Sequence, residues 1–138
     1  MNYVKLEFPA ESRNESLSRA LTAAFVAEAD PTVAELSDIR TAVSEAVTNA
    51  IVHGYGGKGG MIYMTLQREG RKITVTIKDK GCGIADIEKA KEPFYTTAPQ
   101  DERSGMGFAV MEAFSDEFSV ASRPGEGTQI VLVKYLSE

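Results

Sequence analysis

Three polar side chains recur at four-residue intervals in the first half of the chain. Glu45, Asn49 and His53 would lie at positions i, i+4 and i+8 of a helix, on a strip turned away from Val43 and Val47. A carboxylate, an amide and an imidazole on one strip face either water or a ligand. Because such residues are also common on the solvent side of amphipathic helices, the strip by itself leaves both interpretations open.

Three glycine-bearing segments follow in order. Asp79-Lys80-Gly81-Cys82-Gly83 comes directly after an alternating apolar run, which puts a carboxylate at a strand end and lets the backbone approach a ligand closely. Residues 103–107, Arg-Ser-Gly-Met-Gly, lead into a helical pattern, where free N–H groups and the helix dipole favour an anion such as a phosphate. Gly127-Thr128 opens the last strand. Each motif alone is equally compatible with an ordinary turn.

The cysteine and histidine content excludes several other chemistries. Cys82 is the only cysteine and His53 the only histidine, so the chain can form no internal disulfide and offers no zinc-type ligand set. Cys–His and Ser–His–Asp nucleophile arrangements are excluded as well, because Cys82 lies between two glycines and His53 is the only imidazole. Any enzymatic activity must therefore use carboxylates, amides and a bound cofactor.

Hydrophobic periodicity predicts the elements that position these residues. Alternation predicts strands over Tyr3–Phe8, Ile62–Leu66, Ile73–Ile77, Phe118–Ser122 and Thr128–Leu136. Helical spacing predicts helices over Ser12–Ala29, from Asp30-Pro31 to His53-Gly54, and over Gly107–Phe114, with a short helix at 86–90. Ser12 with Glu15 has the spacing of a capping box, and Asp30 precedes a proline in the manner of a second N-cap. The expected apolar stripe of the first helix is Leu17, Ala20, Leu21, Ala24 and Phe25.

Length and charge narrow the class of protein. The 138 residues, of which 43% are hydrophobic and 25% charged, predict a single domain over 1–138 with a substantial core. A formal net charge of -5 argues against duplex DNA or an anionic membrane as the main partner. No run approaches the ~20 apolar residues of a membrane helix, and the amino end lacks a signal-peptide layout, so a cytoplasmic location is expected.

The ordered set of motifs resembles the N, G1, G2 and G3 boxes of the ATP-binding (GHKL) superfamily that includes gyrase, Hsp90, histidine kinases and MutL. Within it, residues 45–55 (EAVTNAIVHGY) and 102–108 (ERSGMGF) look like those of the anti-sigma F family of endospore-forming bacteria. The similarity extends through residues 14–16, 23–27 and 30–32. The resemblance implies an α+β fold, a two-layer α/β sandwich whose mixed, mostly antiparallel sheet carries its helices on one face. It also implies an ATP-dependent protein-serine kinase that uses ATP, ADP and Mg²⁺.

Family roles carry over onto matching positions of this sequence. In the family, the asparagine of the first box coordinates Mg²⁺ and the glutamate one turn earlier is the general base, which implies these roles for Asn49 and Glu45. The aspartate of the second box binds the adenine amino group, a role that falls to Asp79, and Thr128 would help to hold adenine. The other positions implied in the nucleotide pocket are His53, Gly81 and Gly83.

The segment over about 84–106 resembles the ATP lid of the family. Arg103 matches an arginine that approaches the γ-phosphate, although a solvated loop arginine is the simpler alternative. The residues implied to contact nucleotide in and beside the lid are Thr96, Thr97, Ser104, Gly105, Met106 and Gly107.

The resemblance also implies partners. Members of the family form a homodimer that inhibits a sporulation sigma factor of the sigma F type and phosphorylates a serine of an anti-anti-sigma protein. Glu15 and Arg19 match partner-binding positions, and an ordinary i,i+4 ion pair explains them as well. The strand Tyr3–Phe8 is a candidate dimer edge, because an unpaired strand invites pairing. Two alternatives stay open: an anti-sigma kinase of the general-stress branch, and a non-catalytic module whose sigma binding is gated by nucleotide.

Overall fold

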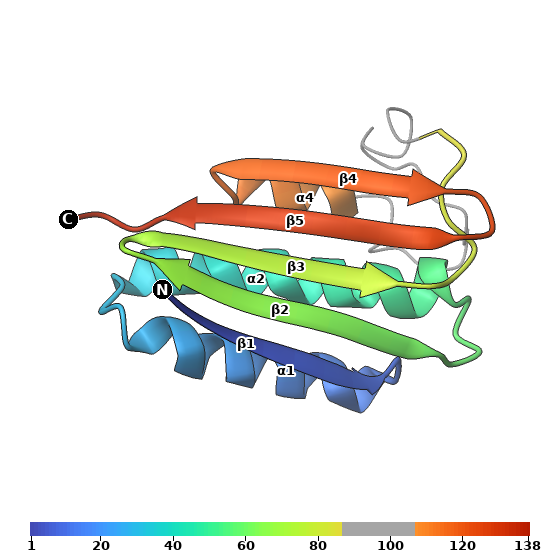
Figure 1. The fold of residues 1–138 in the computed structure, drawn as a ribbon, viewed down its shortest axis with the longest axis horizontal. Helices are drawn as coiled ribbons and strands as arrows, with labels where there is room; N and C mark the ends of the chain where they lie inside the picture. Colours follow the sequence, from blue (N-terminus) through green and yellow to red (C-terminus); the bar gives the residue numbers. More distant parts are fainter. Residues whose placement is uncertain (87–106) are drawn as a thin grey trace.

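The computed structural model describes residues 1–86 and 107–138. Five described strands form one sheet in the order β1-β2-β3-β5-β4, and all four neighbouring pairs are antiparallel (Figure 1). The strands are β1 Asn2–Pro9, β2 Met61–Glu69, β3 Lys72–Asp79, β4 Glu117–Arg123 and β5 Gly127–Tyr135. The helices are α1 Ser12–Ala27, α2 Val33–Asn49 and α4 Gly107–Ala113, with a π-helical turn η1 at Ala50–Gly54.

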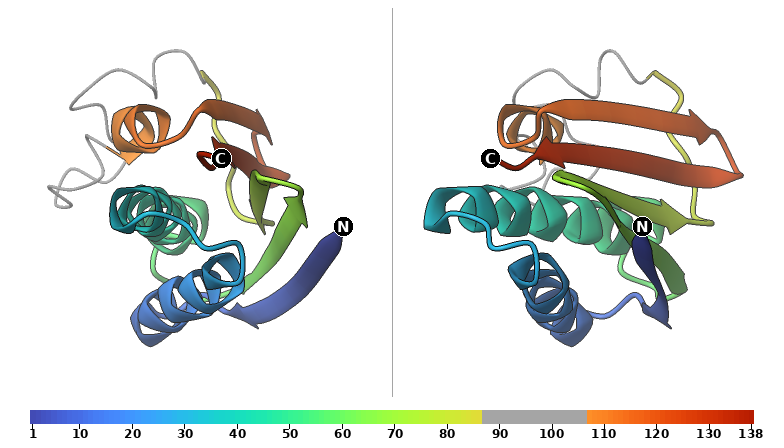
Figure 2. Two further views of the ribbon diagram at one scale, coloured as in Figure 1. Left: turned by 90° about the vertical axis from the view of Figure 1, so that its left-hand side faces the viewer. Right: turned by 60° about the vertical axis from the view of Figure 1, so that its left-hand side comes forward.

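The helices form a second layer on one face of the sheet. Helix α2 lies in the middle of this layer, with α1 towards the β1 edge and α4 towards the β4 edge (Figure 2). The expected two-layer α+β fold is therefore confirmed, as are the two hairpins and the helix that begins at Gly107. The short helix expected at 86–90 and nearly all of the expected lid fall outside the described residues.

The core lies between the two layers. Alternate residues of β2, β3 and β5 point towards the helices, and this alternation gives the sheet one apolar face. Helix α2 meets that face with Ile39, Val43 and Val47, each at most 4% exposed. The sheet contributes these buried apolar side chains to the core: Phe8, Ile62, Met64, Leu66, Ile73, Val75, Ile77, Ile130 and Leu132.

The apolar stripe expected on α1 is wrong except at Phe25, which is partly buried against the core. Leu17 is 51% and Leu21 38% exposed, whereas Ser18, Thr22 and Val26 are buried. The two buried hydroxyls are satisfied by the helix itself, since Ser18 Oγ donates to the Glu15 carbonyl and Thr22 Oγ1 to the Ser18 carbonyl, each at 2.7 Å. Small hydroxyl side chains that bond to their own helix let α1 pack closely on α2, and the leucines are left at the surface.

The expected helix caps are also wrong. Helix α1 begins after Glu11 without any side-chain cap bond, so Ser12 is its first residue and not its N-cap. Thr32 caps α2 instead: its hydroxyl accepts from Glu35 N at 3.0 Å, and its own N–H donates to Glu35 Oε1 at 2.8 Å. Asp30 has a φ of 53°, and this left-handed residue follows the end of α1. The chain therefore turns at Asp30 and starts α2 three residues later, at Val33.

Candidate functional site

Helix α2 changes its winding where the candidate site begins. From Ala50 the helix widens into η1, in which Tyr55 N donates to the Ala50 carbonyl at 3.0 Å, an i to i+5 bond. The strip expected from sequence joins Glu45 and Asn49, both partly exposed and four residues apart on the α-helical part of α2. His53 follows inside η1.

The loop after β3 packs directly against η1. Cys82 N donates to the Gly54 carbonyl at 2.7 Å, and Cys82 Sγ lies 3.1 Å from the His53 carbonyl. A Cβ added at Gly81 would lie only 1.8 Å from the Gly54 carbonyl oxygen, so no other residue fits there without moving the backbone. The end of β3 is thereby held against the carboxyl end of the α2–η1 helix.

Asp79 is the most buried carboxylate at this junction, with 2% of its surface exposed. Its Oδ1 accepts from Gly81 N at 2.9 Å. Burial raises the pKa of Asp79 above its usual value, and the N–H groups of Gly81 and Thr128 oppose that rise. In the part of the chain that the structure describes, no cation pairs with Asp79. A buried carboxylate that lacks a cation is suited to a neutral N–H donor on a ligand.

Thr128 lies beside Asp79 across the β3–β5 ladder. It is buried, and its Oγ1 is 2.8 Å from Ser122 Oγ, which in turn accepts from Ile84 N at 2.8 Å. These bonds connect the β3 loop to the β4–β5 hairpin. Sequence reasoning missed Ser122, because nothing in the local pattern of β4 distinguishes it from a surface serine.

Glu45 lies next to the start of α4. A Cβ added at Gly107 would be 3.8 Å from Glu45 Oε2, and Gly107 itself is buried. One end of α2 therefore brings together the Glu45–Asn49 strip, the 79–83 loop with Thr128, and Gly107. Most of the candidate residues that are described meet here: Glu45, Asn49, His53, Asp79, Gly81, Gly83, Gly107 and Thr128. Thr96, Thr97, Arg103, Ser104, Gly105 and Met106 lie outside the described residues.

The chemistry of the donors suits a nucleotide with a hard cation. Among residues 1–86 and 107–138, no group of three or more His, Cys, Asp or Glu side chains could hold a metal ion. A magnesium ion bound to the Asn49 amide oxygen would take its other ligands from phosphates and water, which is how Mg²⁺ is commonly held beside nucleotides. The buried Asp79 carboxylate and the glycine-lined loop would accept the base.

The two candidate partner residues lie on α1, beside the Glu45 side of this junction. Arg19 Nη2 is 3.4 Å from Glu15 Oε2, as the i,i+4 alternative predicts. Glu15 also accepts a hydrogen bond from Ser44, the residue before Glu45. Local spacing carries no signal for the Ser44–Glu15 bond, because it joins residues 29 positions apart.

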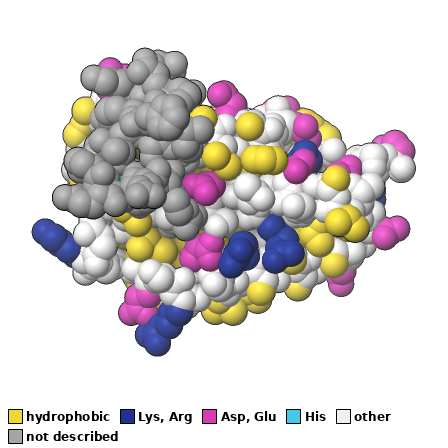
Figure 3. Space-filling view, turned by 180° about the vertical axis from the view of Figure 1, so that it is seen from behind, with side chains coloured by type: hydrophobic (Ala, Val, Ile, Leu, Met, Phe, Trp, Pro, Cys, Tyr) yellow, Lys and Arg dark blue, Asp and Glu magenta, His cyan; other side chains and the backbone are white. Residues whose placement is uncertain are grey.

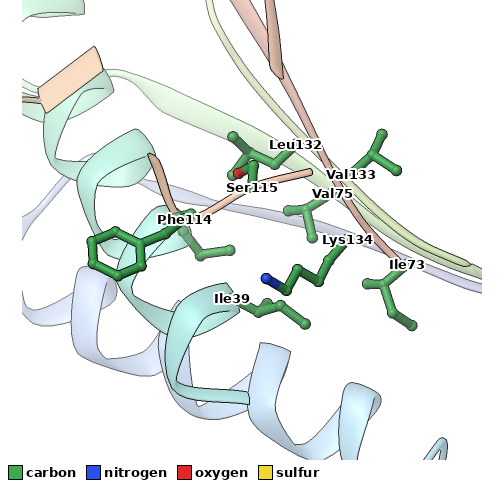
Figure 4. Close-up of a pocket in the computed structure, with 10 residues that line it drawn as sticks. Ile39, Ile73, Val75, Phe114, Ser115, Leu132, Val133 and Lys134 are labelled. Carbon is green, nitrogen blue, oxygen red and sulfur yellow. The ribbon is translucent and has the colours of Figure 1, made fainter. Parts of the chain in front are cut away.

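A cavity beside the middle of α2 is too small for a ligand. It lies between α2, α4, β3 and β5, and Figure 4 shows its lining residues, among them Ile39, Val75 and Phe114. Its volume is about 10 Å³, room for roughly one water molecule. Lys134 at its wall is paired with Asp38 at 3.1 Å. The cavity is a gap in the packing, and the α2–β3 junction remains the candidate site.

Comparison with known proteins agrees with this fold. Residues 8–134 match the family described as the histidine kinase-like ATPase domain. Among solved structures, the RsbU and RsbW domains of a Mycobacterium tuberculosis protein align with a TM-score of 0.72 and 22% identity, over 100% of this chain and 33% of that one. The catalytic domain of the histidine kinase ThkA aligns with a TM-score of 0.60 and 16% identity, over 99% and 97%. At such identities these two structures support the fold alone.

Three curated relatives with about 50% identity are all named anti-sigma F factor. The chain is 51% identical over 135 residues to the anti-sigma F factor of Thermoanaerobacter sp. strain X514, covering 98% of this chain and 94% of that one. It is 51% identical over 133 residues to that of Clostridium acetobutylicum, covering 96% and 93%. It is 50% identical over 138 residues to that of Bacillus licheniformis, covering 99% and 94%. The chain therefore belongs to the histidine kinase-like ATPase family and, within it, to the family of the anti-sigma F factors.

The family assignment implies nucleotide binding. It confirms the resemblance drawn from the motifs, whereas the role of each site residue stays a prediction. In the described part of the chain, no helix is both long and apolar enough to cross a membrane.

Proposed function

We propose that this chain is an ATP-dependent protein-serine kinase that also binds and inhibits a sigma factor of the sigma F type. The names of relatives at about 50% identity support the sigma-binding half. One observation carries the enzymatic half: a carboxylate, an amide, a buried aspartate and a helix-opening glycine meet at one end of α2. The antagonist that it phosphorylates is an anti-anti-sigma protein.

Adenine would occupy the β3 side of this junction. The Asp79 carboxylate would accept a hydrogen bond from the amino group of the base. Thr128 lies beside Asp79, and Gly81 and Gly83 would leave room for the ring. The segment 84–106 would cover the nucleotide, with Thr96, Thr97 and residues 103–106 towards the phosphates.

The phosphates would extend towards Asn49 and Glu45. Magnesium, held by the Asn49 amide oxygen, neutralises charge on the phosphates when it is bound. Glu45 accepts the proton of the acceptor serine as the serine oxygen bonds to the γ-phosphorus. The bond from that phosphorus to the bridging oxygen breaks, and ADP leaves. Arg103 is proposed to stabilise charge on the transferred group.

Phosphotransfer to the anti-anti-sigma protein tests this proposal. With Mg²⁺ and labelled ATP, the wild-type chain should label that protein on serine. Glu45→Gln should lower the rate by about 10²-fold or more, the usual contribution of a general base, while ATP affinity stays unchanged. Glu28→Gln, a change to an exposed glutamate at the end of α1, is the matched control.

The outcomes separate the alternatives. Good ATP binding without any transfer by the wild-type chain would contradict the kinase and favour the non-catalytic, nucleotide-gated module, as would an unchanged rate for Glu45→Gln. Binding measured in parallel to a sporulation sigma factor and to a general-stress sigma factor distinguishes the two anti-sigma branches.

We infer that the β1 side of the molecule forms a homodimer interface. Strand β1 is an edge of the described sheet. Asn14 of α1 donates to the Pro9 carbonyl at 2.9 Å, and Leu17 and Leu21 follow at i+3 and i+7 on the same side of the helix. The exposed leucines and Val4, itself 38% exposed, give this edge an apolar surface that a second copy would cover.

Light scattering of the purified chain tests the dimer. The wild-type protein should have twice the chain mass, and Leu21→Glu should be monomeric at the same concentration. Val33→Glu replaces an apolar residue that is 88% exposed at the start of α2, and this control should remain dimeric. A monomeric wild-type chain, or a dimeric Leu21→Glu, would contradict the proposed interface.

A further inference from the structure

A polar groove lies between α1 and α2 on the helical face of the molecule. It has a volume of about 330 Å³, and a second groove of about 470 Å³ adjoins it, sharing Arg19 and Ser44. Figure 3 looks onto this face, where Lys and Arg side chains gather near the middle. The first groove is lined by Arg19, Ser37, Arg40, Thr41, Ser44 and Glu45. It therefore opens at the residue proposed as the base.

The groove carries side chains of opposite charge. At one end is the Glu45 carboxylate. At the other is Arg40, which is exposed and makes no ion pair or hydrogen bond with any residue in 1–86 or 107–138. The positive charge of Arg19 is balanced by Glu15 at 3.4 Å, and Ser44 donates a hydrogen bond to Glu15. Arg40 is thus an uncompensated cation on a chain whose net charge is -5.

The distance between Arg40 and Glu45 along α2 indicates how long a bound peptide segment would be. Arg40 and Glu45 are five residues apart, or about 7.5 Å along the helix axis. An extended segment covers that distance in two to three residues at about 3.3 Å each. Thr41 and Ser44 lie between Arg40 and Glu45 along α2, and Ser37 lies about one turn beyond Arg40. The hydroxyls of these residues can bond to the backbone of such a segment.

We propose that this groove binds the segment of the protein substrate that carries the acceptor serine, and that Arg40 binds an Asp or Glu side chain two or three residues from that serine. The inference rests on the proposed kinase function and adds a specificity-determining residue to it. The acceptor segment is the occupant because its serine must reach Glu45, where the groove opens. An acidic side chain is expected since a guanidinium binds a carboxylate through paired hydrogen bonds.

Steady-state phosphorylation of the anti-anti-sigma protein tests Arg40. Arg40→Gln should raise the KM for that protein about tenfold, as expected for the loss of one charged hydrogen-bonded contact, and leave kcat and ATP affinity within about twofold. Arg40→Glu should raise KM further, and Arg40→Lys should restore part of the loss. Arg13→Gln, on the exposed side of α1 outside the groove, is the matched control.

A charge exchange then identifies the bound side chain. Each acidic residue within three positions of the acceptor serine is changed to Lys and assayed with Arg40→Glu. One of these pairs should recover a KM near that of the wild-type pair. An unchanged KM for Arg40→Gln, the absence of any rescuing pair, or a loss confined to sigma-factor binding would each overturn the inference. Absence of labelling by the wild-type chain would instead overturn the proposed function.

Discussion

Replacement of Gly83 by alanine should disturb the loop that holds the proposed adenine pocket. Gly83 has a φ of 75°, and an added Cβ would lie 1.9 Å from the Arg123 carbonyl oxygen. A left-handed alanine costs about 1–2 kcal/mol, and forcing the backbone apart adds about 1–3 kcal/mol. We therefore expect a destabilisation of about 2–5 kcal/mol.

Gly125 provides a matched control. Its φ is 79°, and an added Cβ would meet nothing within 4 Å, so Gly125→Ala carries only the left-handed cost. The difference between the two variants isolates the overlap with Arg123. At about 2 kcal/mol, and with an m-value near 2 kcal/mol/M, it corresponds to a urea midpoint about 1 M lower for Gly83→Ala.

Urea unfolding and nucleotide binding are measured on both variants. Gly83→Ala should also weaken ATP binding, because the displaced loop carries Asp79 and Gly81, whereas Gly125→Ala should bind ATP like the wild-type chain. Equal urea midpoints for the two variants would refute the steric reasoning. An unaltered ATP affinity in Gly83→Ala would separate the loop from the proposed adenine pocket.

Three further predictions concern stability and use urea unfolding. Thr32→Ala should cost about 1 kcal/mol through loss of the capping box, and Ser12→Ala less than about 0.5; equal effects would contradict the observed caps. The N–H groups of Thr32 and Ser137 lower the pKa of Glu35 from 4.5 to about 2. Its contribution is therefore present above pH 4.5 and lost as the pH falls towards 2, so Glu35→Gln should flatten the acid dependence of stability; an unchanged slope would refute this. Asp30→Gly should gain up to about 1 kcal/mol, because glycine adopts the φ of 53° more easily; a loss would contradict that conformation.

Strands and helices were largely predictable from residue types. Alternation in β2, β3 and β5 matches the observed strands, because a sheet with one covered face requires a period of two. The caps were harder: Ser12 with Glu15 and Thr32 with Glu35 share the same spacing, and only the second pair forms the box. Whether a capping motif forms its hydrogen bonds depends on where the chain enters the helix, which residue spacing does not determine.

Part of the candidate site was also predictable from sequence, and part was not. Glu45 and Asn49 share a strip as expected, since both precede the change of winding at Ala50. His53 lies within η1, and no helical-wheel argument includes a π-helical turn. The bond from Ser44 to Glu15 depends on how α1 packs against α2, so local spacing carried no sign of it.

The sequence alone determined the order of the motifs along the chain, and that order identified the family. Each motif could be found from sequence because turn glycines and periodic side chains act over only a few residues. Tertiary structure decided which face of α1 is buried and which segments meet. Gly54 against Gly81, and Gly107 beside Glu45, are contacts between residues far apart in the chain. Such contacts form because the helices and the sheet pack into two layers that exclude water between them. Which residues meet therefore depends on the packing of the whole domain.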